Sequence, residues 1–504
     1  MPTGSFQRHA PADDAPRVVE RAALELAARV ESAPAIEPSA AGGLHAATAS
    51  RVYLRLEESV EPTDLLQWLR GQPAGARRYF RDRSTKLEVA SVGTAAACAF
   101  GEHEAWSQVG KGQDWKGHEW KGQEARSSEA KSSEAKNSEA RSHEAGSGSS
   151  RATGPRASAW FVSLPFDGAR ARDAAWTRFT GQSCLLPEIE LRRDGEQHVL
   201  AVHITAATDR PALAAALRRA SASADSCVVE PALVRQSDGN GEADWTRAVR
   251  AGLERIRAGA MRKIVLARTR RYSASGALDP VAVLSRLAAR ESRGFRFMIE
   301  AGAGHAFLGV TPERLFSRSG RIARSEAVAG TRPRGVDGVA DRLLGESLLA
   351  SAKDRREHEL VVERVREALA GCATSLRVDG EPRLLRLAYV QHLATRVQAE
   401  LRAGIGDREL VRALHPTPAV AGAPVAEAIE ALREFEPFDR GLYAGPVGVV
   451  SRDGAEIAVA IRSARIDGDQ LTAFAGAGIV EGSDPAEEWR ETGHKLLAFE
   501  RLAT

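Results

Sequence analysis

The stretch AGAGIVEGSDPAEEWRETGHK, residues 475–495, decides the fold class. It joins an apolar, strand-like segment to a helix with a clear start, in which Asp484 is the N-cap and Pro485 lies in the first turn. A glycine-rich turn between a strand and a helix is also typical of dinucleotide-binding folds. Only 22 residues follow Gly482, however, and the helix takes them, so we expect no second strand to carry a ribose-binding carboxylate. This interpretation excludes a dinucleotide fold.

The helix that begins at Pro485 places two carboxylates and an ammonium group on one face. Glu488, Glu491 and Lys495 follow one another at spacings of three and four residues, so all three can reach a common ligand. Glu491 and Lys495 taken alone are more often a surface ion pair that stabilises a helix. A functional interpretation requires a further carboxylate from elsewhere in the chain.

Glu357 is the candidate for that carboxylate. It lies in a helix predicted to begin near Ser351, beside the apolar stripe of that helix. A purely structural alternative is an ion pair with Lys353 or Arg364 at the rim of the stripe. Glutamates from two separate helices, with little nitrogen or sulfur nearby, suit a hard cation such as Mg²⁺.

Lys263 and Glu313 are candidates for acid–base chemistry. Lys263 opens the apolar strand KIVLAR (263–268), where it is either an edge-strand lysine that discourages aggregation or a general base that faces a cleft. Glu313, in VTPERLF, ends a strand just after a proline. It is a general acid if burial raises its pKa, or simply the partner of Arg314.

The second half of the chain, 243–504, consists of long helical and strand-like segments joined by glycine-rich turns, and it carries all the candidate chemistry. We expect a hairpin in which a turn at 301–304 joins two strands, because that turn contains two glycines. The predicted helices are 243–258, 279–291, 407–414 and one from 485 onward, and the predicted strands are 263–268, 295–300, 306–311, 444–450, 456–466 and 471–476.

The first half reads as a leader followed by part of the same fold. Residues 1–50 are rich in Ala, Pro and Ser, and we expect a flexible leader with one helix at 17–30. Ordered structure is predicted to begin at 51 and to extend to 242, with strands at 51–58, 86–93, 159–164 and 198–204 and a short helix at 64–71.

A charge repeat interrupts this first half. Lys or Arg recurs every five residues from 111 to 141, and Asp or Glu does so from 114 to 144, giving seven charges of each sign. A period of five matches neither helix nor strand, so no apolar face forms. We interpret 107–150 as a low-complexity, disordered insert, in preference to a binding element.

The composition sets the broad class. Of the 504 residues 43% are hydrophobic, which is enough for a large core. The net charge of +3 is too small to indicate a surface that binds nucleic acid or acidic membranes. Four widely separated cysteines indicate reduced thiols rather than a disulfide framework. We find no signal peptide and no run of eighteen apolar residues, and we therefore expect a cytoplasmic protein without a membrane or nucleic-acid partner.

Several motifs in a fixed order closely resemble the chorismate-utilising (chorismate-binding) enzymes over essentially all of 243–504. A fainter similarity at 75–105 and 155–210 looks like the N-terminal half of the isochorismate synthases. The resemblance implies an α/β (α+β) fold with a large antiparallel β-sheet sandwich surrounded by helices, and it implies chorismate as substrate with Mg²⁺. The motifs are KIVLAR, TPERLF, SEAVAGTRPRG, KDRREHELVVERV, VQHL, HPTPAVAGAP, EPFDRGLYAGPVG, AIRSA and AGAGIVEGSDPAEEWRETGHK.

The resemblance also implies residue roles. Lys263 matches the lysine that activates water for attack at C2 of chorismate, and Glu313 matches the acid that protonates the departing C4 hydroxyl. Glu357 and Glu491 match metal ligands, with Glu488 supporting the metal shell. The positions that match substrate-binding or cleft-lining residues of the family are Ala329, Gly330, Thr331, His392, Tyr443, Arg462, Gly476 and Lys495.

Differences between branches of the family favour an isochorismate synthase, which is an isomerase. Anthranilate synthases carry glutamine at the position of Lys263, and aminodeoxychorismate synthases carry a lysine at the position of Ala329. A salicylate synthase, which shares the lysine and both glutamates and goes on to eliminate pyruvate, is the main alternative. A non-catalytic chorismate-binding protein is the alternative from another class, and it would have no need of base, acid and metal ligands together.

The expected partner is the small-molecule substrate alone, and we expect a monomer or a weak homodimer. The sequence leaves open whether the product would enter menaquinone or siderophore biosynthesis.

Overall fold

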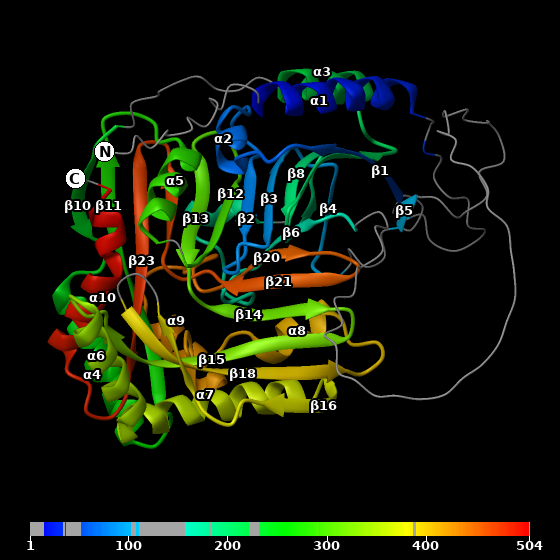
Figure 1. The fold of residues 1–504 in the computed structure, drawn as a ribbon. Coiled ribbons are helices and arrows are strands. Elements are labelled where there is room, and N and C mark those ends of the chain that lie inside the picture. Colours follow the sequence, from blue (N-terminus) through cyan, green and yellow to red (C-terminus); the bar gives the residue numbers. More distant parts are fainter. Residues whose placement is uncertain are drawn as a thin grey trace, which may run out of the picture.

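Two large β-sheets with helices packed around them form the structure (Figure 1). The computed structural model describes residues 15–33, 36, 52–101, 107–109, 157–180, 183–220, 231–291, 293–386 and 390–502. In these ranges all strand pairs are antiparallel except β1 with β5. The expected α+β class with a large antiparallel sandwich is therefore confirmed.

The larger sheet has thirteen strands in the described ranges, in the order β10-β11-β23-β22-β13-β12-β2-β3-β8-β9-β1-β5, and the short strand β19 pairs with β11. Its strands are β1 (Val52–Val60), β2 (Arg78–Arg81), β3 (Leu87–Val92), β5 (Ser107–Val109), β8 (Ile189–Asp194), β9 (Gln197–Thr205), β10 (Leu233–Asp238), β11 (Lys263–Ala274), β12 (Phe295–Glu300), β13 (His305–Thr311), β19 (Gly422–Ala423), β22 (Ser463–Asp467) and β23 (Gln470–Ile479).

The smaller sheet has ten described strands, in the order β16-β18-β15-β14-β21-β20-β6-β7-β4, with β17 paired to β18. Its strands are β4 (Ala96–Cys98), β6 (Trp160–Ser163), β7 (Cys184–Leu186), β14 (Arg314–Ser319), β15 (Ile322–Pro333), β16 (Ala373–Val378), β17 (Arg383–Arg386), β18 (Val390–Leu401), β20 (Pro446–Val450) and β21 (Gly454–Val459).

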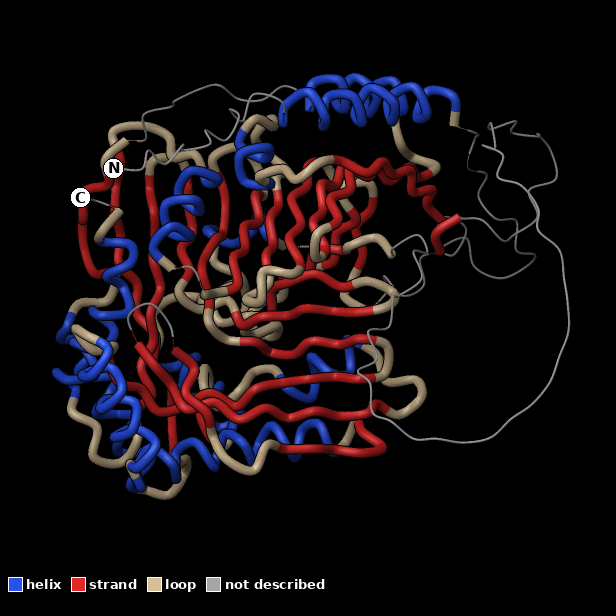
Figure 2. Tube along the Cα trace, viewed as in Figure 1, coloured by secondary structure: helices blue, strands red, loops and turns tan. Residues whose placement is uncertain are grey.

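Both halves of the chain contribute to both sheets. In the larger sheet β12 pairs with β2, so that Met298 lies opposite Tyr79. In the smaller sheet β20 pairs with β6, so that Gly448 lies opposite Val162. The strands of one sheet cross those of the other (Figure 2), and apolar side chains from both fill the space between them. The first half is thus part of the same folded unit that carries the candidate site.

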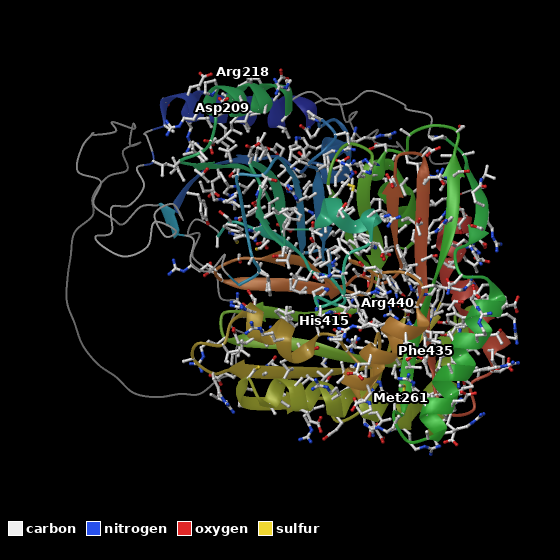
Figure 3. All side chains as sticks on the ribbon, turned by 180° about the vertical axis from the view of Figure 1, so that it is seen from behind. Asp209, Arg218, Met261, His415, Phe435 and Arg440 are labelled. Carbon is white, nitrogen blue, oxygen red and sulfur yellow. The ribbon has the colours of Figure 1, made fainter. Side chains whose placement is uncertain are left out.

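Helices cover the outer surfaces of the sheets. They are α1 (Ala15–Ser32), α2 (Leu65–Arg70), α3 (Arg210–Ala220), α4 (Glu242–Arg257), α5 (Pro280–Arg290), α6 (Gly338–Ala350), α7 (Ala352–Ala370), α8 (Asp407–Leu414), α9 (Val425–Phe435) and α10 (Pro485–Glu500), with a 3₁₀ helix, η3 (Ala174–Phe179). Helices α1 and α3, which carries Arg218, lie side by side on the larger sheet (Figures 1 and 3). The apolar side of α1, with Leu26 and Val30, joins a second core there. No described helix is long and apolar enough to cross a membrane.

One predicted strand is wrong. The alternating segment 456–466 was expected to form a single strand, but it divides into β21 of the smaller sheet and β22 of the larger one. Arg462 lies at the break with a φ of +50°, a left-handed conformation that a β-strand cannot contain. The chain crosses between the sheets at this residue.

The predicted leader and insert lie mostly outside the described residues. Of 107–150, only Ser107–Val109 is described, and this short stretch is strand β5, paired parallel with β1. Of the leader, 15–33 and 36 are described, and the helix expected at 17–30 is α1.

Candidate active site

Lys263 begins β11, which lies inside the larger sheet between β10 and β23. The residue itself pairs with Ala423 of β19, so the edge-strand interpretation of this lysine is wrong. Its side chain passes over Gly478 in β23, where an added Cβ would stand 2.9 Å from the lysine Cε and 3.4 Å from Nζ. A glycine at 478 therefore leaves room for the ammonium group to lie across the sheet, half-buried.

Glu313 lies where the chain passes from β13 in the larger sheet to β14 in the smaller one. Its backbone carbonyl accepts a hydrogen bond from Val459 N at 3.0 Å, and its Oε1 accepts one from Thr417 Oγ1 at 3.3 Å. Burial raises the pKa of Glu313 to about 7, although the Thr417 hydroxyl and the charges of Lys263 and Lys495 act to lower it. A carboxylic acid in this state can give up a proton near neutral pH.

Arg462 lies at the second crossing between the sheets, next to the first. Its carbonyl accepts a hydrogen bond from Val310 N at 3.3 Å, and Val310 is in β13, three residues before Glu313. Burial lowers the pKa of the Arg462 guanidinium, opposed by Glu291 and Tyr443. The two crossings thus bring a cation and an acid to the same end of β13.

Tyr443 and Gly476 lie against each other. A Cβ added to Gly476 would stand 3.1 Å from Tyr443 Oη and 3.0 Å from the carbonyl oxygen of Leu266. The tyrosine ring stacks on Phe474, with ring centroids 5.2 Å apart and an interplanar angle of 16°. Burial raises the pKa of Tyr443 far above its usual value, so its hydroxyl stays a hydrogen-bond donor. A side chain at 476 would force this hydroxyl or the Leu266 carbonyl to move, so the glycine suits the close approach of β23.

Helix α10 presents Glu488, Glu491 and Lys495 beside β23, as its spacing predicted. Lys495 Nζ lies 2.7 Å from Glu491 Oε1 and donates to the Gly476 carbonyl at 2.8 Å. Burial acts to raise the pKa of Glu491, but the charge and the hydrogen bond of Lys495, together with the charge of Lys263, lower it below its usual value. Burial raises the pKa of Glu488, and the nearby Glu491 carboxylate adds to that rise.

His392 of β18 and the segment 329–331 of β15 contact each other in the smaller sheet. A β-bulge separates Ala329 from Thr331 in the pairing of β15 with β18, and Gly330 at the bulge has a φ of +70°. Thr331 Oγ1 and the Gly330 carbonyl lie 3.0 and 3.2 Å from His392 Nδ1. Burial, helped by the charge of Arg462, lowers the pKa of His392 to about 3, so the ring is neutral.

Electrostatic coupling ties these side chains into one site. The charges of Lys263 and Lys495 act on Glu313 and on Glu491, and those of Glu313 and Arg462 act on Tyr443. The structure therefore brings together the predicted base, acid and substrate-binding residues, which come from elements separated by more than two hundred residues of chain.

The metal prediction is tested only in part. Glu357 lies on α7, three residues after Asp354, which lies against the bulge at Gly330, but the side chain of Glu357 lies outside the described residues. Among the described side chains, no group of three His, Cys, Asp or Glu residues could hold a metal ion. The Glu491 carboxylate lies close enough to Glu488 to raise its pKa. Two neighbouring carboxylates offer the oxygen ligands that a hard cation prefers. A metal site there stays a prediction.

Sequence reasoning missed Thr417 and a buried ion pair behind β11. Thr417 stands in HPTPAVAGAP, which served only as a family motif and gave no sign of a contact with Glu313. Glu436 accepts a hydrogen bond from Ala267 N at 2.8 Å, and Arg440 (Figure 3) donates to the Val265 carbonyl at 2.6 Å. The pair fixes the backbone of the strand that carries Lys263, and no local pattern reveals such a contact.

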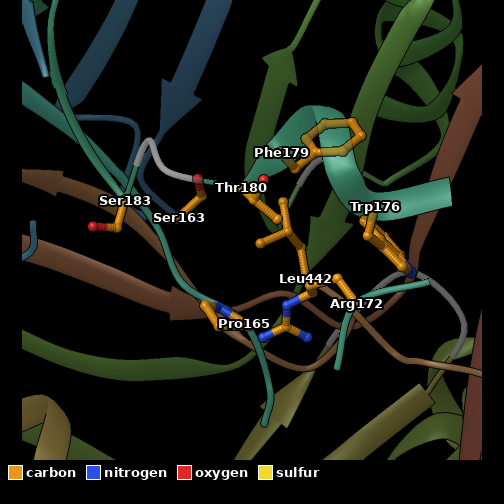
Figure 4. A pocket seen from close by; sticks show the side chains of 9 residues that line it. Ser163, Pro165, Arg172, Trp176, Phe179, Thr180, Ser183 and Leu442 are labelled. Atoms are coloured by element: carbon orange, nitrogen blue, oxygen red, sulfur yellow. The ribbon is translucent and has the colours of Figure 1, made fainter. Parts of the chain in front are cut away.

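The apolar cavity of about 150 Å³ shown in Figure 4 lies elsewhere. Leu442, next to Tyr443, is the lining residue nearest in sequence to the predicted set. The described lining residues are Ser163, Pro165, Arg172, Trp176, Phe179, Thr180, Ser183, Gly441 and Leu442. A wall of this composition does not suit a dianionic substrate, so we place the site at the polar cluster.

Comparison with known proteins finds isochorismate synthases among the relatives of this chain. A salicylate biosynthesis isochorismate synthase of Pseudomonas aeruginosa is 38% identical over 355 residues, which cover 69% of this chain and 74% of that protein. The isochorismate synthase MenF of Bacillus subtilis is 33% identical over 342 residues, covering 67% of this chain and 72% of that protein.

Solved structures show the same fold. That of MenF, the menaquinone-specific isochorismate synthase from Escherichia coli, superposes with a TM-score of 0.73 at 25% identity, covering 96% of this chain and 99% of that one. Anthranilate synthase component I from Streptococcus pneumoniae, at 23% identity and a TM-score of 0.58 over 69% of this chain and 81% of that one, shares the fold alone. The model of the chorismate binding enzyme family matches residues 40–502, and the chain belongs to this family.

Proposed function

We propose that the chain is an isochorismate synthase, which converts chorismate to isochorismate by adding water at C2 and losing the C4 hydroxyl. The observation that carries the proposal is the pair of Lys263 and Glu313, which act on each other electrostatically within one site. Glu313, with a pKa of about 7, can hold a proton and give it up near neutral pH, as a general acid must. The sequences of the relatives named above support the same reaction.

The reaction exchanges one hydroxyl of the ring for another. Lys263 takes a proton from a water whose oxygen bonds to C2 of the ring. The ring double bond shifts, the bond from C4 to its hydroxyl breaks, and Glu313 gives its proton to that hydroxyl, which leaves as water. One water enters and one leaves, so the net change is an isomerisation, and a final exchange of protons with solvent restores both side chains.

The positive groups of the site suit a dianion. Arg462 and Lys495 supply fixed charge, and Tyr443 supplies a neutral hydroxyl donor for a carboxylate. His392, neutral because its pKa is about 3, adds no positive charge and contacts Thr331. These groups bind and orient both carboxylates of chorismate, which leaves the ring between Lys263 and Glu313.

Mg²⁺ is the proposed cofactor. Glu491 of α10 and Glu357 of α7 would hold it, with Glu488 supporting the metal shell. Glu488 and Glu491 are close carboxylates on one helix, and carboxylate oxygens are ligands that Mg²⁺ prefers. When bound, the ion supplies positive charge that neutralises a substrate carboxylate.

Product analysis tests the proposal. Purified protein is incubated with chorismate and Mg²⁺, and the products are separated by liquid chromatography. Isochorismate without pyruvate is expected; salicylate with an equal amount of pyruvate would instead identify a salicylate synthase. Chorismate that binds but stays unchanged over hours would identify a non-catalytic binding protein.

The base is tested by Lys263→Ala. This variant should lose turnover and keep Mg²⁺-dependent binding of chorismate, measured by calorimetry. Turnover at the level of the natural protein would remove Lys263 from the mechanism.

A further inference from the structure

Arg268 lies on the strand that carries Lys263, and it connects that strand to helix α10. Its side chain is fully buried. Its Nε donates to Thr492 Oγ1 at 2.6 Å and its Nη2 to the Trp489 carbonyl at 3.3 Å. The guanidinium also lies over the Trp489 ring, 3.5 Å from its centroid. One side chain of β11 thus makes three contacts with two residues of α10, which lie about one helical turn apart.

The arrangement is more specific than charge neutralisation requires. Asp238 of β10 balances the charge of Arg268, with Oδ1 3.0 Å from Nη1, and it also binds Arg270 at 2.6 Å. Burial lowers the pKa of Arg268 to about 10, opposed by Asp238. A buried ion pair is weak evidence of stabilisation, because apolar residues of similar volume often serve equally well. What distinguishes the planar guanidinium is that its N–H groups donate hydrogen bonds in fixed directions.

Those directions set the rotation of α10 about its own axis. Trp489 and Thr492 face Arg268, whereas Glu488, Glu491 and Lys495 occupy the neighbouring face, about a quarter turn away at 100° per residue. A carboxylate roughly 7 Å from a helix axis moves by about 1 Å when the helix rotates by about 8°. Small rotations would therefore misplace all three side chains together.

The other contacts of α10 near this face restrict the rotation of the helix less than Arg268 does. Trp245 of α4 packs on Trp489, with ring centroids 6.1 Å apart, and its Nε1 donates to the Pro485 carbonyl at 3.2 Å. The bond from Lys495 to the Gly476 carbonyl comes from a flexible side chain that also pairs with Glu491. Arg268 supplies the rigid planar contact among them.

We infer that Arg268 is a positioning residue, which holds α10 at the rotation that directs Glu488, Glu491 and Lys495 toward Lys263. The inference rests on the proposed function, since it assigns Arg268 to the same reaction. It gives a reason for a buried cation in β11 that the roles of base, acid and substrate ligand leave unexplained.

The test compares Arg268→Met with Arg77→Met, each in the Lys263→Ala background so that chorismate is not consumed. Arg77 is a matched control: it is also buried and also pairs with carboxylates, Glu300 and Asp279, at the end of β12 away from Glu313. The affinity for Mg²⁺ is measured by calorimetry at saturating chorismate, and the melting temperature is measured alongside. Arg268→Met should weaken Mg²⁺ binding about tenfold or more, and Arg77→Met by less than about twofold.

Arg268→Lys separates positioning from stability. Lysine keeps the charge for Asp238 but lacks the planar fork, so it should restore the melting temperature and leave Mg²⁺ affinity low. Recovery of both in parallel would overturn the inference, as would unchanged affinity in Arg268→Met. If Arg268→Met does not fold, Thr492→Val carries the test, with a loss of about threefold expected and no loss overturning it. A Lys263→Ala protein that binds neither Mg²⁺ nor chorismate would instead refute the proposed function.

Discussion

Replacing Glu313 with glutamine should make the folded protein more stable at alkaline pH while removing the proposed acid. The pKa of Glu313 is raised from 4.5 to about 7 by burial, so its ionised form is disfavoured in the folded chain. Glutamine has a similar shape and never ionises. The free energy of unfolding should therefore be higher in the variant at every pH at which the natural carboxyl is ionised in the unfolded chain.

The sign and size follow from the two pKa values. Below pH 4.5 the carboxyl is protonated in the folded and in the unfolded chain, and the folded state carries no penalty. The penalty grows as the pH rises from 4.5 to about 7 and is constant above, because the group is then ionised in both states. It amounts to about 1 kcal/mol at pH 5 and about 3 kcal/mol at pH 8.

Thermal melting in the presence of a chelator measures this difference. Unfolding of a chain of about 500 residues has an entropy near 1 kcal/mol/K, so Glu313→Gln should melt about 1 °C above the natural protein at pH 5 and about 3 °C above it at pH 8. Glu367→Gln, at an exposed site on α7, is the control and should show no trend with pH. An offset for Glu313→Gln that is equal at both pH values, or absent, would refute the assignment of a buried acid.

Three further predictions concern activity. Thr417→Val removes a hydrogen bond that favours the ionised form of Glu313, so the alkaline limb of the pH profile of kcat/KM should move up by about one pH unit, from about 7 to about 8. Gly478→Ala would place a methyl group 2.9 Å from Lys263 Cε, and displacing this base should lower kcat by about tenfold to a hundredfold with little change in melting temperature. Glu491→Gln should raise the Mg²⁺ concentration for half-maximal activity by about tenfold or more.

A control variant or a contradicting outcome tests each of these three predictions. Gly276→Ala, where an added methyl group meets nothing within 4 Å, should leave kcat unchanged. A pH profile of Thr417→Val that coincides with that of the natural protein would contradict the proposed role of Glu313. Full activity of the natural protein in excess chelator would contradict the metal assignment to Glu491.

Local patterns predicted the site best where its residues stand on regular elements. The cap at Asp484 and the spacing of Glu488, Glu491 and Lys495 depend only on helix geometry, and α10 has both features as expected. The hairpin of β12 and β13 was likewise visible from its two strands and its glycine turn. Such features arise from interactions between near neighbours in the chain.

What the patterns missed arises from contacts distant in sequence. The alternation through 456–466 gives no sign that Arg462 adopts a positive φ, because the crossing is imposed by the two sheets that receive β21 and β22. Thr417 reaches Glu313 across about a hundred residues of chain. Propensity cannot report either contact, whereas the family motifs pointed to Arg462 without explaining its geometry.

The sharing of both sheets by the two halves limits how the chain can be shortened. A fragment that began at residue 243 would retain every predicted catalytic residue, yet it would expose the edges of β12 and β20 that β2 and β6 now cover. Uncovered edges of this length, with apolar residues such as Phe297 and Val449 beside them, invite pairing with other copies. Such a truncated enzyme would be lost to aggregation before its chemistry could be measured.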